Sequence, residues 1–114
     1  MIYLFYIWIT ITAVYTDGVT ETPFIVFVRE IESNSPVNNT FSFSIPKSLT
    51  AGHYDHMTAT FKYKWATDCD VMFNLRGTGF YYNTHLKGNG EDSYNGTWQA
   101  PYSNAFSLTV ILTQ

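Results

Sequence analysis

Residues 57–65 read MTATFKYKW, and this stretch decides the fold class. Apolar residues (Met57, Ala59, Phe61, Tyr63 and Trp65) alternate here with the polar Thr58, Thr60, Lys62 and Lys64. Successive side chains of a β-strand point to opposite faces of its sheet, so a period of two predicts a strand with one apolar and one polar face. The apolar face needs a second layer to cover it, and in a chain without long helical periodicity that layer is another sheet.

Short segments on both sides of this strand carry similar patterns. Strands are expected at residues 24–31, 41–45, 71–75, 80–86 and 106–112. Residues 33–39 (SNSPVNN) and 87–96 (KGNGEDSYNG) are expected to be loops, because Gly, Asn, Ser and Pro are frequent in them. Short strands with turn residues between them predict an all-β protein, an antiparallel two-sheet β-sandwich of about seven strands. A jelly roll or a small closed barrel is the alternative.

The composition fits one small domain and argues against a nucleic-acid binder. The chain has 114 residues, enough for one domain and not for two. Hydrophobic residues make up 46%, which is enough for a packed core, and aromatic residues reach 18%. Six Lys and Arg against nine Asp and Glu give a net charge of −3, so no excess of positive charge is available to neutralise phosphates.

The N-terminal segment predicts the cellular compartment. Residues 2–14, IYLFYIWITITAV, contain no charge, Gly or Pro. This run is too short for a transmembrane helix of about 20 residues and matches the apolar part of a signal peptide, about 7 to 15 residues. Residues 1–16 are therefore predicted to be a signal peptide, residues 17–114 a single β-sandwich domain, and the protein to be secreted. The alternative is a strand, because Ile9-Thr10-Ile11-Thr12 alternates.

The chain has a single cysteine, Cys69, so no disulfide can form within it. Asp68 and Asp70 flank this residue, and neighbouring carboxylates disfavour a thiolate by like-charge repulsion. Cys69 is therefore expected to be a buried structural thiol rather than a nucleophile. A disulfide between two chains is the alternative.

Two sequons accompany the predicted secretion. They are Asn38-Asn39-Thr40 and Asn95-Gly96-Thr97, and neither has Pro in the middle position. Both fall in stretches that read as turns, where a glycan would be exposed. Asn38 and Asn95 are therefore predicted glycosylation sites.

No motif in the sequence predicts a metal site, a cofactor or catalysis. His53, Asp55 and His56 are close in sequence, but no further Cys or His pair completes a zinc site. Residues 89–92 (NGED) offer oxygen ligands without the spacing of a calcium loop. Solvated turns explain both groups, so no cofactor and no metal are expected.

Enzyme activity is not expected either. The sequence contains no nucleophile elbow, HExxH motif or phosphate-binding loop. A glycan-cleaving enzyme needs two carboxyl groups about 5 to 10 Å apart. The acidic pairs Asp68/Asp70 and Glu91/Asp92 are candidates for this role, and nothing in the sequence places either pair across a cleft.

Aromatic residues outside the core pattern carry the functional prediction. They are Tyr81, Tyr94, Trp98 and Tyr102, which lie off the apolar face or among Gly, Asn and Pro. A ring with an apolar body and a polar tip suits sugar stacking, protein interfaces and membrane headgroups. Packing over the end of a sheet is the plain alternative.

These residues predict a secreted, non-catalytic recognition module that binds glycans or membrane headgroups through aromatic loops. The alternative is a protein–protein interaction or structural module that binds no small ligand. The expected partners are a glycan, a lipid headgroup or a cell-surface protein, and not a nucleic acid. The ligand's identity and a homo-oligomeric state stay open.

Residues 58–83 resemble the actinoporin-like β-sandwich family and the fungal fruit-body lectins. The matching positions in the first group are Phe61, Tyr63, Val71, Met72, Phe73, Tyr82 and Asn83, and in the second Thr58 to Phe61 and Cys69 to Val71. The resemblance implies a sandwich with glycan- or membrane-binding loops. The chain lacks the Pro-Asp-Tyr-Asn and Tyr-Ser-Asn-Trp-Trp signatures of the membrane-binding loop. Gly79-Phe80-Tyr81-Tyr82 with Leu86 also resembles a strand of C1q- and TNF-like jelly rolls.

Overall fold

The structure is a computed structural model of the 114-residue chain. It describes residues 2–45, 54–66, 68–77, 79–99 and 105–114, apart from the side chain of Trp98. Of the residues discussed above, His53 and Tyr102 lie outside these ranges.

The described residues form two four-stranded antiparallel sheets. The strands are β1 (Tyr3–Tyr15), β2 (Glu21–Ser33), β3 (Val37–Ser44), β4 (Tyr54–Ala66), β5 (Asp70–Gly77), β6 (Phe80–Leu86), β7 (Gly90–Gln99) and β8 (Ala105–Thr113). Sheet A has the order β2-β1-β4-β7, and sheet B has the order β3-β8-β5-β6. The predicted antiparallel β-sandwich is confirmed, with eight strands in the described ranges.

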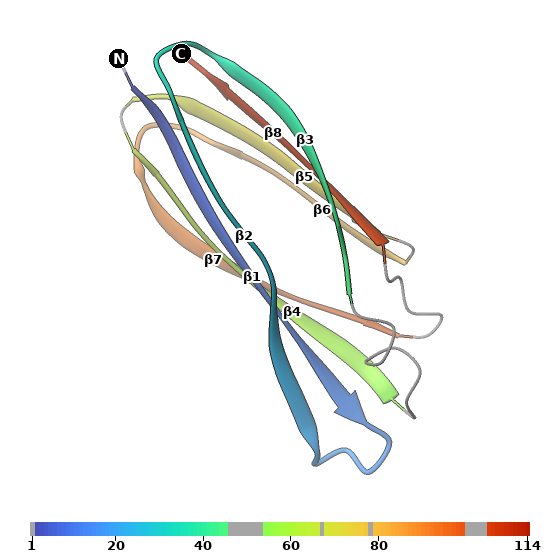
Figure 1. Ribbon diagram of the computed structural model, residues 1–114. Coiled ribbons are helices and arrows are strands. Elements are labelled where there is room, and N and C mark those ends of the chain that lie inside the picture. The colour runs from blue at the N-terminus through green and yellow to red at the C-terminus, as the bar shows by residue number, and fades with distance from the viewer. Residues whose placement is uncertain (1, 46–53, 67, 78, 100–104) are drawn as a thin grey trace.

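The two sheets lie along the long axis of an elongated molecule. Its principal extents are 49, 22 and 18 Å, and both termini lie at the same end (Figure 1). The long axis matches the three strands of 13 residues, β1, β2 and β4, all of which belong to sheet A. Sheet A is therefore the longer layer of the sandwich.

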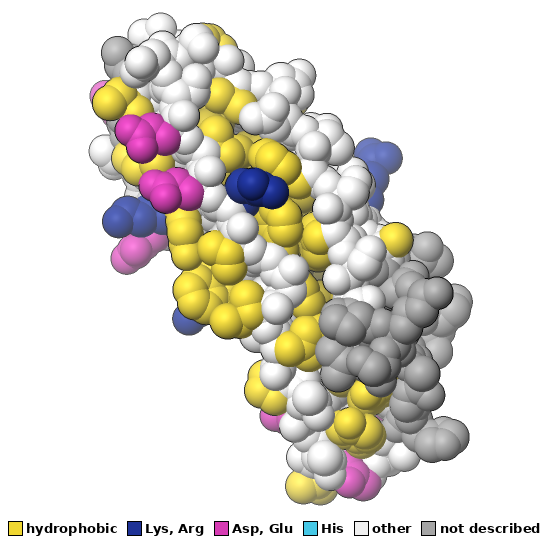
Figure 2. Space-filling model, viewed as in Figure 1, with side chains coloured by type: hydrophobic (Ala, Val, Ile, Leu, Met, Phe, Trp, Pro, Cys, Tyr) yellow, Lys and Arg dark blue, Asp and Glu magenta, His cyan; other side chains and the backbone are white. Residues whose placement is uncertain are grey.

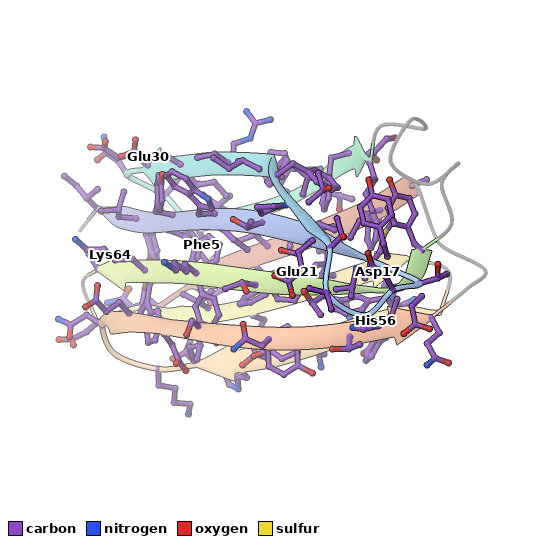
Figure 3. The ribbon with its side chains drawn as sticks, turned by 90° about the horizontal axis from the view of Figure 1, so that it is seen from below. Phe5, Asp17, Glu21, Glu30, His56 and Lys64 are labelled. Carbon is purple, nitrogen blue, oxygen red and sulfur yellow. The ribbon has the colours of Figure 1, made fainter. Side chains whose placement is uncertain are left out.

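Strand β1 occupies a central position in sheet A. It pairs with β2 on one side and β4 on the other, and Figure 3 shows the four strands of the sheet side by side. Within the described residues β2 has no other ladder partner. Phe5, Ile7 and Ile9 are completely buried, and Ile11 is nearly so. As in β4, every second side chain of β1 therefore points into the core between the sheets.

The core consists of the inward-facing residues of both sheets. Facing pairs within sheet A include Phe5 with Trp65, Ile7 with Tyr63 and Ile9 with Phe61. The inward-facing residues of sheet B are Val71, Phe73 and Leu75 from β5, and Phe106, Leu108, Val110 and Leu112 from β8. The rings of Phe5 and Phe73 meet across the two layers with their centroids 5.7 Å apart.

The side of the sandwich formed by β2 and β3 is closed by aromatic side chains. Phe27 of β2 stacks on Phe43 of β3 at 4.8 Å, and Phe43 stacks on Phe106 at 5.3 Å. The Arg29 guanidinium lies over the Phe41 ring at 4.7 Å. Figure 2 shows hydrophobic side chains in a strip along the molecule, with a basic side chain lying on it. Half-buried rings and one cation thus cover the seam between the sheets.

A tight turn at residues 16–20 joins β1 to β2. The Asp17 carboxylate accepts hydrogen bonds from the backbone N–H groups of Val19 and Thr20 at 2.9 and 2.8 Å. The Thr20 hydroxyl also donates to this carboxylate and is the main reason that the pKa of Asp17 is lowered. The two backbone N–H groups lower the pKa further. Gly18 adopts a φ of 72°, a conformation that favours glycine. The Asp17-Gly18 pair that follows the predicted signal peptide is therefore a hairpin turn in this structure.

The N-terminal segment folds as a strand in the structure of the whole chain. Signal-peptide cleavage after residue 16 stays a prediction, and a chain so cleaved would lack β1. Strand β2 would then lose its ladder partner, and sheet A could not have the order described above. Cleavage and this fold are therefore mutually exclusive.

The two expected loops are shorter than predicted, and the expectation that both sequons lie in turns is wrong. Residues 90–96, expected within a loop, belong to β7, and residues 37–39 belong to β3. Both sequons, at Asn38 and Asn95, consequently lie in strands rather than turns. The reason is that β3 and β7 are edge strands, and an edge strand with its outer face in water tolerates polar residues without losing its ladder.

The membership of β1 in the core can be tested by substitution in the full chain. Ile9→Ala removes a completely buried side chain and should lower the free energy of unfolding by about 2 to 5 kcal/mol. Thr12→Ala, on the outer face of the same strand, should change it by less than about 1 kcal/mol. Urea denaturation of both variants measures the difference, and equal small effects would show that residue 9 is not in the core.

Candidate functional site

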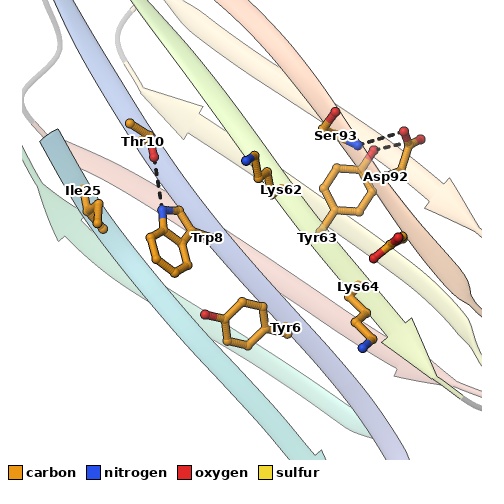
Figure 4. Close-up of a pocket in the computed structure, with 10 residues that line it drawn as sticks. Tyr6, Trp8, Thr10, Ile25, Lys62, Tyr63, Lys64, Asp92 and Ser93 are labelled. Atoms are coloured by element: carbon orange, nitrogen blue, oxygen red, sulfur yellow. Dashed lines mark hydrogen bonds between the residues drawn. The ribbon is translucent and has the colours of Figure 1, made fainter. Parts of the chain in front are cut away.

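A broad hollow lies on the outer face of sheet A. It has a volume of about 770 Å³ and is open to solvent (Figure 4). Strand β1 contributes Tyr6, Trp8 and Thr10 to its lining, β2 contributes Ile25, β4 contributes Lys62 and Lys64, and β7 contributes Glu91 and Ser93. Tyr63 and Asp92 also line it. The outward-facing halves of all four strands of sheet A therefore meet here.

Two aromatic rings from β1 dominate the hollow. Trp8 is 37% exposed, although it belongs to a central strand. Its indole Nε1–H donates a hydrogen bond to Oγ1 of Thr10 at 3.1 Å, and this bond orients the ring along the strand (Figure 4). Tyr6 follows at the next outward position. The two rings thus form a short aromatic stripe on the sheet surface.

A β-bulge in the β1–β2 ladder brings an apolar side chain to the hollow. Ile9 pairs with Phe27 and Thr10 pairs with Ile25, so Val26 is the extra residue in β2. A bulge changes which side chains of a strand face outward. Ile25 therefore lies beside Thr10 and is 57% exposed. The hollow has an apolar wall on the β2 side as a result.

The opposite wall of the hollow is polar and charged. Lys62 lies opposite Trp8 on one side and Ser93 on the other, and Lys64 lies opposite Glu91. Among the described residues neither lysine makes an ion pair within 4 Å. Both ammonium groups are therefore available as hydrogen-bond donors to a ligand.

A buried tyrosine lies below the β7 side of the hollow. The Tyr63 hydroxyl donates to the Asp92 carboxylate at 3.4 Å and lies 3.3 Å from the Tyr82 hydroxyl. Burial raises the pKa of Tyr63 well above its usual value, and the hydrogen bond to Tyr82 and the charge of Asp92 raise it further. The neutral phenol is therefore the form that the fold holds.

The four aromatic residues predicted as a site do not share one surface where they are described. Tyr81 lies in β6 of sheet B and is 58% exposed. Tyr94 lies in β7 of sheet A, where its ring stacks on Tyr82 at 3.9 Å and on Phe61 at 5.8 Å. Trp98 lies in β7 opposite Met57, and Tyr102 is outside the described residues. Tyr81, Tyr94 and Trp98 thus belong to strands rather than loops.

Sequence reasoning missed Tyr6 and Trp8 because they lie in the segment assigned to the signal peptide. The sequence nevertheless contains a pattern that indicates a strand in this segment. Phe5, Ile7, Ile9 and Ile11 alternate with Tyr6, Trp8, Thr10 and Thr12, so the period of two extends through the whole run. Read as a strand, this pattern places the second set on the outer face.

The groups weighed for metal binding are engaged in other contacts or lie apart. Nδ1 of His56 is 2.8 Å from the Asp55 carboxylate, and Nε2 of His85 is 3.8 Å from that of Asp70. No cluster of three or more potential metal ligands occurs in the described part of the chain. Glu91 and Asp92 are consecutive in β7, so their side chains start toward opposite faces of the sheet.

The cysteine is fully buried. Sγ of Cys69 lies 3.5 Å from the carbonyl oxygen of Ala66, to which it donates a weak hydrogen bond. Burial raises the pKa of the thiol, and the charges of Asp70 and Asp68 add to this effect. A disulfide with another chain would need this part of the core to open.

Comparison of the chain with protein-family models, with curated proteins and with solved structures gives no match. The resemblance of residues 58–83 to actinoporin-like sandwiches and fungal lectins therefore stays a prediction. The described residues include no helix that is long and apolar enough to cross a membrane.

The environment of Tyr63 predicts how stability depends on pH. The pKa of Tyr63 is raised in the folded state, whereas in the unfolded chain the phenol ionises near pH 10. Its contribution to stability is complete below pH 10 and falls as the pH rises further, because only the unfolded state then loses the proton. Urea denaturation at a series of alkaline pH values should show this fall.

Tyr63→Phe isolates the contribution of this phenol. The variant should show a smaller decrease of the free energy of unfolding above pH 10 than the wild-type chain. Asp92→Asn removes the charge that faces the phenol and should also reduce the decrease, by a smaller amount. An unchanged alkaline slope in Tyr63→Phe would show that the phenol is not held neutral by the fold.

Proposed function

We propose that the protein is a non-catalytic recognition module that binds a glycan in the hollow on the outer face of sheet A. The observation that carries the proposal is the stripe formed by the exposed Trp8 and the half-buried Tyr6 beside polar groups of β4 and β7. Aromatic rings held on a hydrogen-bonded sheet offer a stacking surface that loses little conformational entropy on binding.

The chemistry of the lining suits a sugar. A pyranose presents C–H groups on its faces and hydroxyl groups around its edge. The rings of Tyr6 and Trp8 supply apolar surface for such a face. Lys62, Lys64 and Ser93 supply donors, and Ser93 and Glu91 supply acceptors, for the hydroxyl groups. Ligand sites commonly combine apolar walls with a few polar groups in this manner.

We do not propose glycan cleavage as the function of the hollow. Glycoside hydrolysis needs two carboxyl groups on either side of the scissile bond. Of the two carboxylates that line the hollow, Asp92 accepts the hydrogen bond of the Tyr63 phenol. Glu91, on the other face of the strand, lies opposite Lys64. The hollow thus lacks a pair of carboxyl groups aimed at one point.

The binding role of Trp8 is tested with a panel of soluble oligosaccharides, namely cellotetraose, chitotetraose and mannotetraose. Isothermal titration should detect at least one of them. Trp8→Ala should weaken that binding by about 1 to 3 kcal/mol, the usual cost of removing an aromatic anchor. Met72→Ala, which removes an exposed apolar side chain from sheet B, is the matched control and should bind as the wild-type chain does.

Two other results would change the assignment. Binding to phosphatidylcholine or phosphatidylserine vesicles without binding to any oligosaccharide would indicate a lipid headgroup. If the chain binds neither the oligosaccharides nor the vesicles, the result would favour the protein–protein interaction alternative. For that alternative the exposed Ile25 and Val28 beside Trp8 are the supporting observation.

The proposed site also makes a prediction about the mature N-terminus. The sequons at Asn38 and Asn95, both exposed, favour secretion, whereas the apolar N-terminal run favours it only as a cleaved signal peptide and not as β1. A glycan site that uses Tyr6 and Trp8 requires a mature chain that keeps residues 3–15. N-terminal sequencing of the secreted protein shows whether the mature chain keeps residues 3–15. A chain that begins between Val14 and Val19, as signal-peptide cleavage predicts, would eliminate this site.

A further inference from the structure

A second hollow lies on the opposite side of the sandwich, where β5 turns into β6. Its volume is about 530 Å³, and its lining includes Arg76, Phe80 and Tyr81. Arg76 and Tyr81 lie opposite each other in the β5–β6 ladder. Both are exposed on the outer face of sheet B. This site is separate from the hollow of sheet A and does not depend on it.

The guanidinium of Arg76 is held in place on two sides. Its Nε–H donates a hydrogen bond to Oδ1 of Asn74 at 3.0 Å. Its Cζ atom lies 5.2 Å from the centre of the Tyr81 ring, within the range of a cation–π contact. These contacts use Nε and one face of the group, and the two Nη atoms have no hydrogen bond among the described residues. Within the described ranges, the end of the guanidinium that forms paired hydrogen bonds with a carboxylate therefore has no partner.

No carboxylate of this chain neutralises Arg76. All nine acidic side chains lie in the described residues, and none is within 4 Å of the guanidinium. Asp70 is the one acidic residue in the four strands of sheet B. It lies six residues away along β5, about 20 Å at a rise of roughly 3.4 Å per residue. The site thus has an uncompensated positive charge in a chain of net charge −3.

The surroundings of Arg76 consist of hydroxyl and amide groups. One row across the sheet contains Ser42, Ser107, Arg76 and Tyr81. The next row contains Thr40, Thr109, Asn74 and Asn83. The hydroxyl and amide side chains of these rows both donate and accept hydrogen bonds, as the hydroxyl groups of a sugar require, whereas Arg76 only donates. Tyr81 adds an exposed ring, whereas the exposed Met72 lies four residues away along β5.

We infer that the outer face of sheet B binds the carboxylate of an acidic sugar, a uronic acid residue, with Arg76 as the carboxylate-binding group. The two Nη atoms of Arg76 donate paired hydrogen bonds to the carboxylate. Tyr81 holds the guanidinium and contacts the sugar ring. Because Arg76 is ordered before the ligand arrives, binding costs less side-chain entropy than it would at an unrestrained arginine.

The experiment is an NMR titration of the ¹⁵N-labelled full chain with methyl β-D-glucuronoside, compared with the neutral methyl β-D-glucoside. The glucuronoside should shift the Arg76 Nε–H signal and the backbone amides of Gly77 and Tyr81. The neutral sugar should bind at least about tenfold more weakly, since it cannot form the charged pair of hydrogen bonds.

Variants assign the preference to the guanidinium. Arg76→Gln should bind both sugars equally weakly. Arg76→Lys keeps the positive charge but cannot donate two parallel hydrogen bonds to one carboxylate. It should retain only part of the preference for the glucuronoside over the glucoside. Lys87→Gln removes an exposed positive charge just beyond the end of β6, outside both hollows, and is the control that should leave the glucuronoside titration unchanged. Thermal melts of the variants show whether each one is folded.

Three results would overturn the inference. They are equal binding of the two sugars by the wild-type chain, an undiminished preference in folded Arg76→Gln, and the absence of any shift at millimolar glucuronoside. N-acetyl-aspartate amide is a further arm of the titration. If it binds more tightly than the glucuronoside with the same shifts, the site takes a peptide carboxylate and not a sugar acid.

Discussion

The burial of alternate β1 side chains between the two sheets is the interaction on which the rest of the structure depends. Phe5, Ile7, Ile9 and Ile11 are almost entirely removed from solvent. Each contributes about 1.5 to 3 kcal/mol from burial alone. The same strand supplies both ladders that connect β2 and β4, so sheet A exists as a four-stranded layer only with β1 in place. The outward-facing half of β1 then presents Tyr6 and Trp8 on a rigid support.

The two sheets share one pattern of inward- and outward-facing residues. In each sheet most inward-facing residues are apolar, while the outward-facing ones are mostly polar, with exposed apolar exceptions at Ile25, Val28 and Met72. The charged groups are concentrated differently on the two outer faces. Lys62 and Lys64 lie beside Glu91 on sheet A, whereas Arg76 lies among uncharged residues on sheet B. The outer face of sheet A thus has charges of both signs close together, whereas the charge of Arg76 stands alone among polar neighbours.

The fold class could be predicted from sequence because period-two alternation is strong in β4, β8 and β3, where one face is buried and the other is wet. Edge strand β7 could not be recognised, since its residues GEDSYNG are polar on both faces and resemble a loop. Only the ladder with β4 makes this segment a strand. Strand β1 was ambiguous for another reason, because an apolar run at an N-terminus has the composition both of a buried strand and of a signal peptide. Because the run was assigned to a signal peptide, Tyr6 and Trp8 were not considered as candidate site residues.

The central claim is that β1 is a structural strand of the native protein, and amide hydrogen exchange of the full chain tests it most directly. Amides that open only with global unfolding exchange most slowly. The account predicts that the amides of β1 hydrogen-bonded to β2 and β4, among residues 4–14, exchange as slowly as those of β4. It also predicts that they exchange more slowly than the outward-facing amides of the edge strands β3 and β7. Rapid exchange throughout residues 4–14 in a folded chain would contradict the account, because it would show that the core forms without β1.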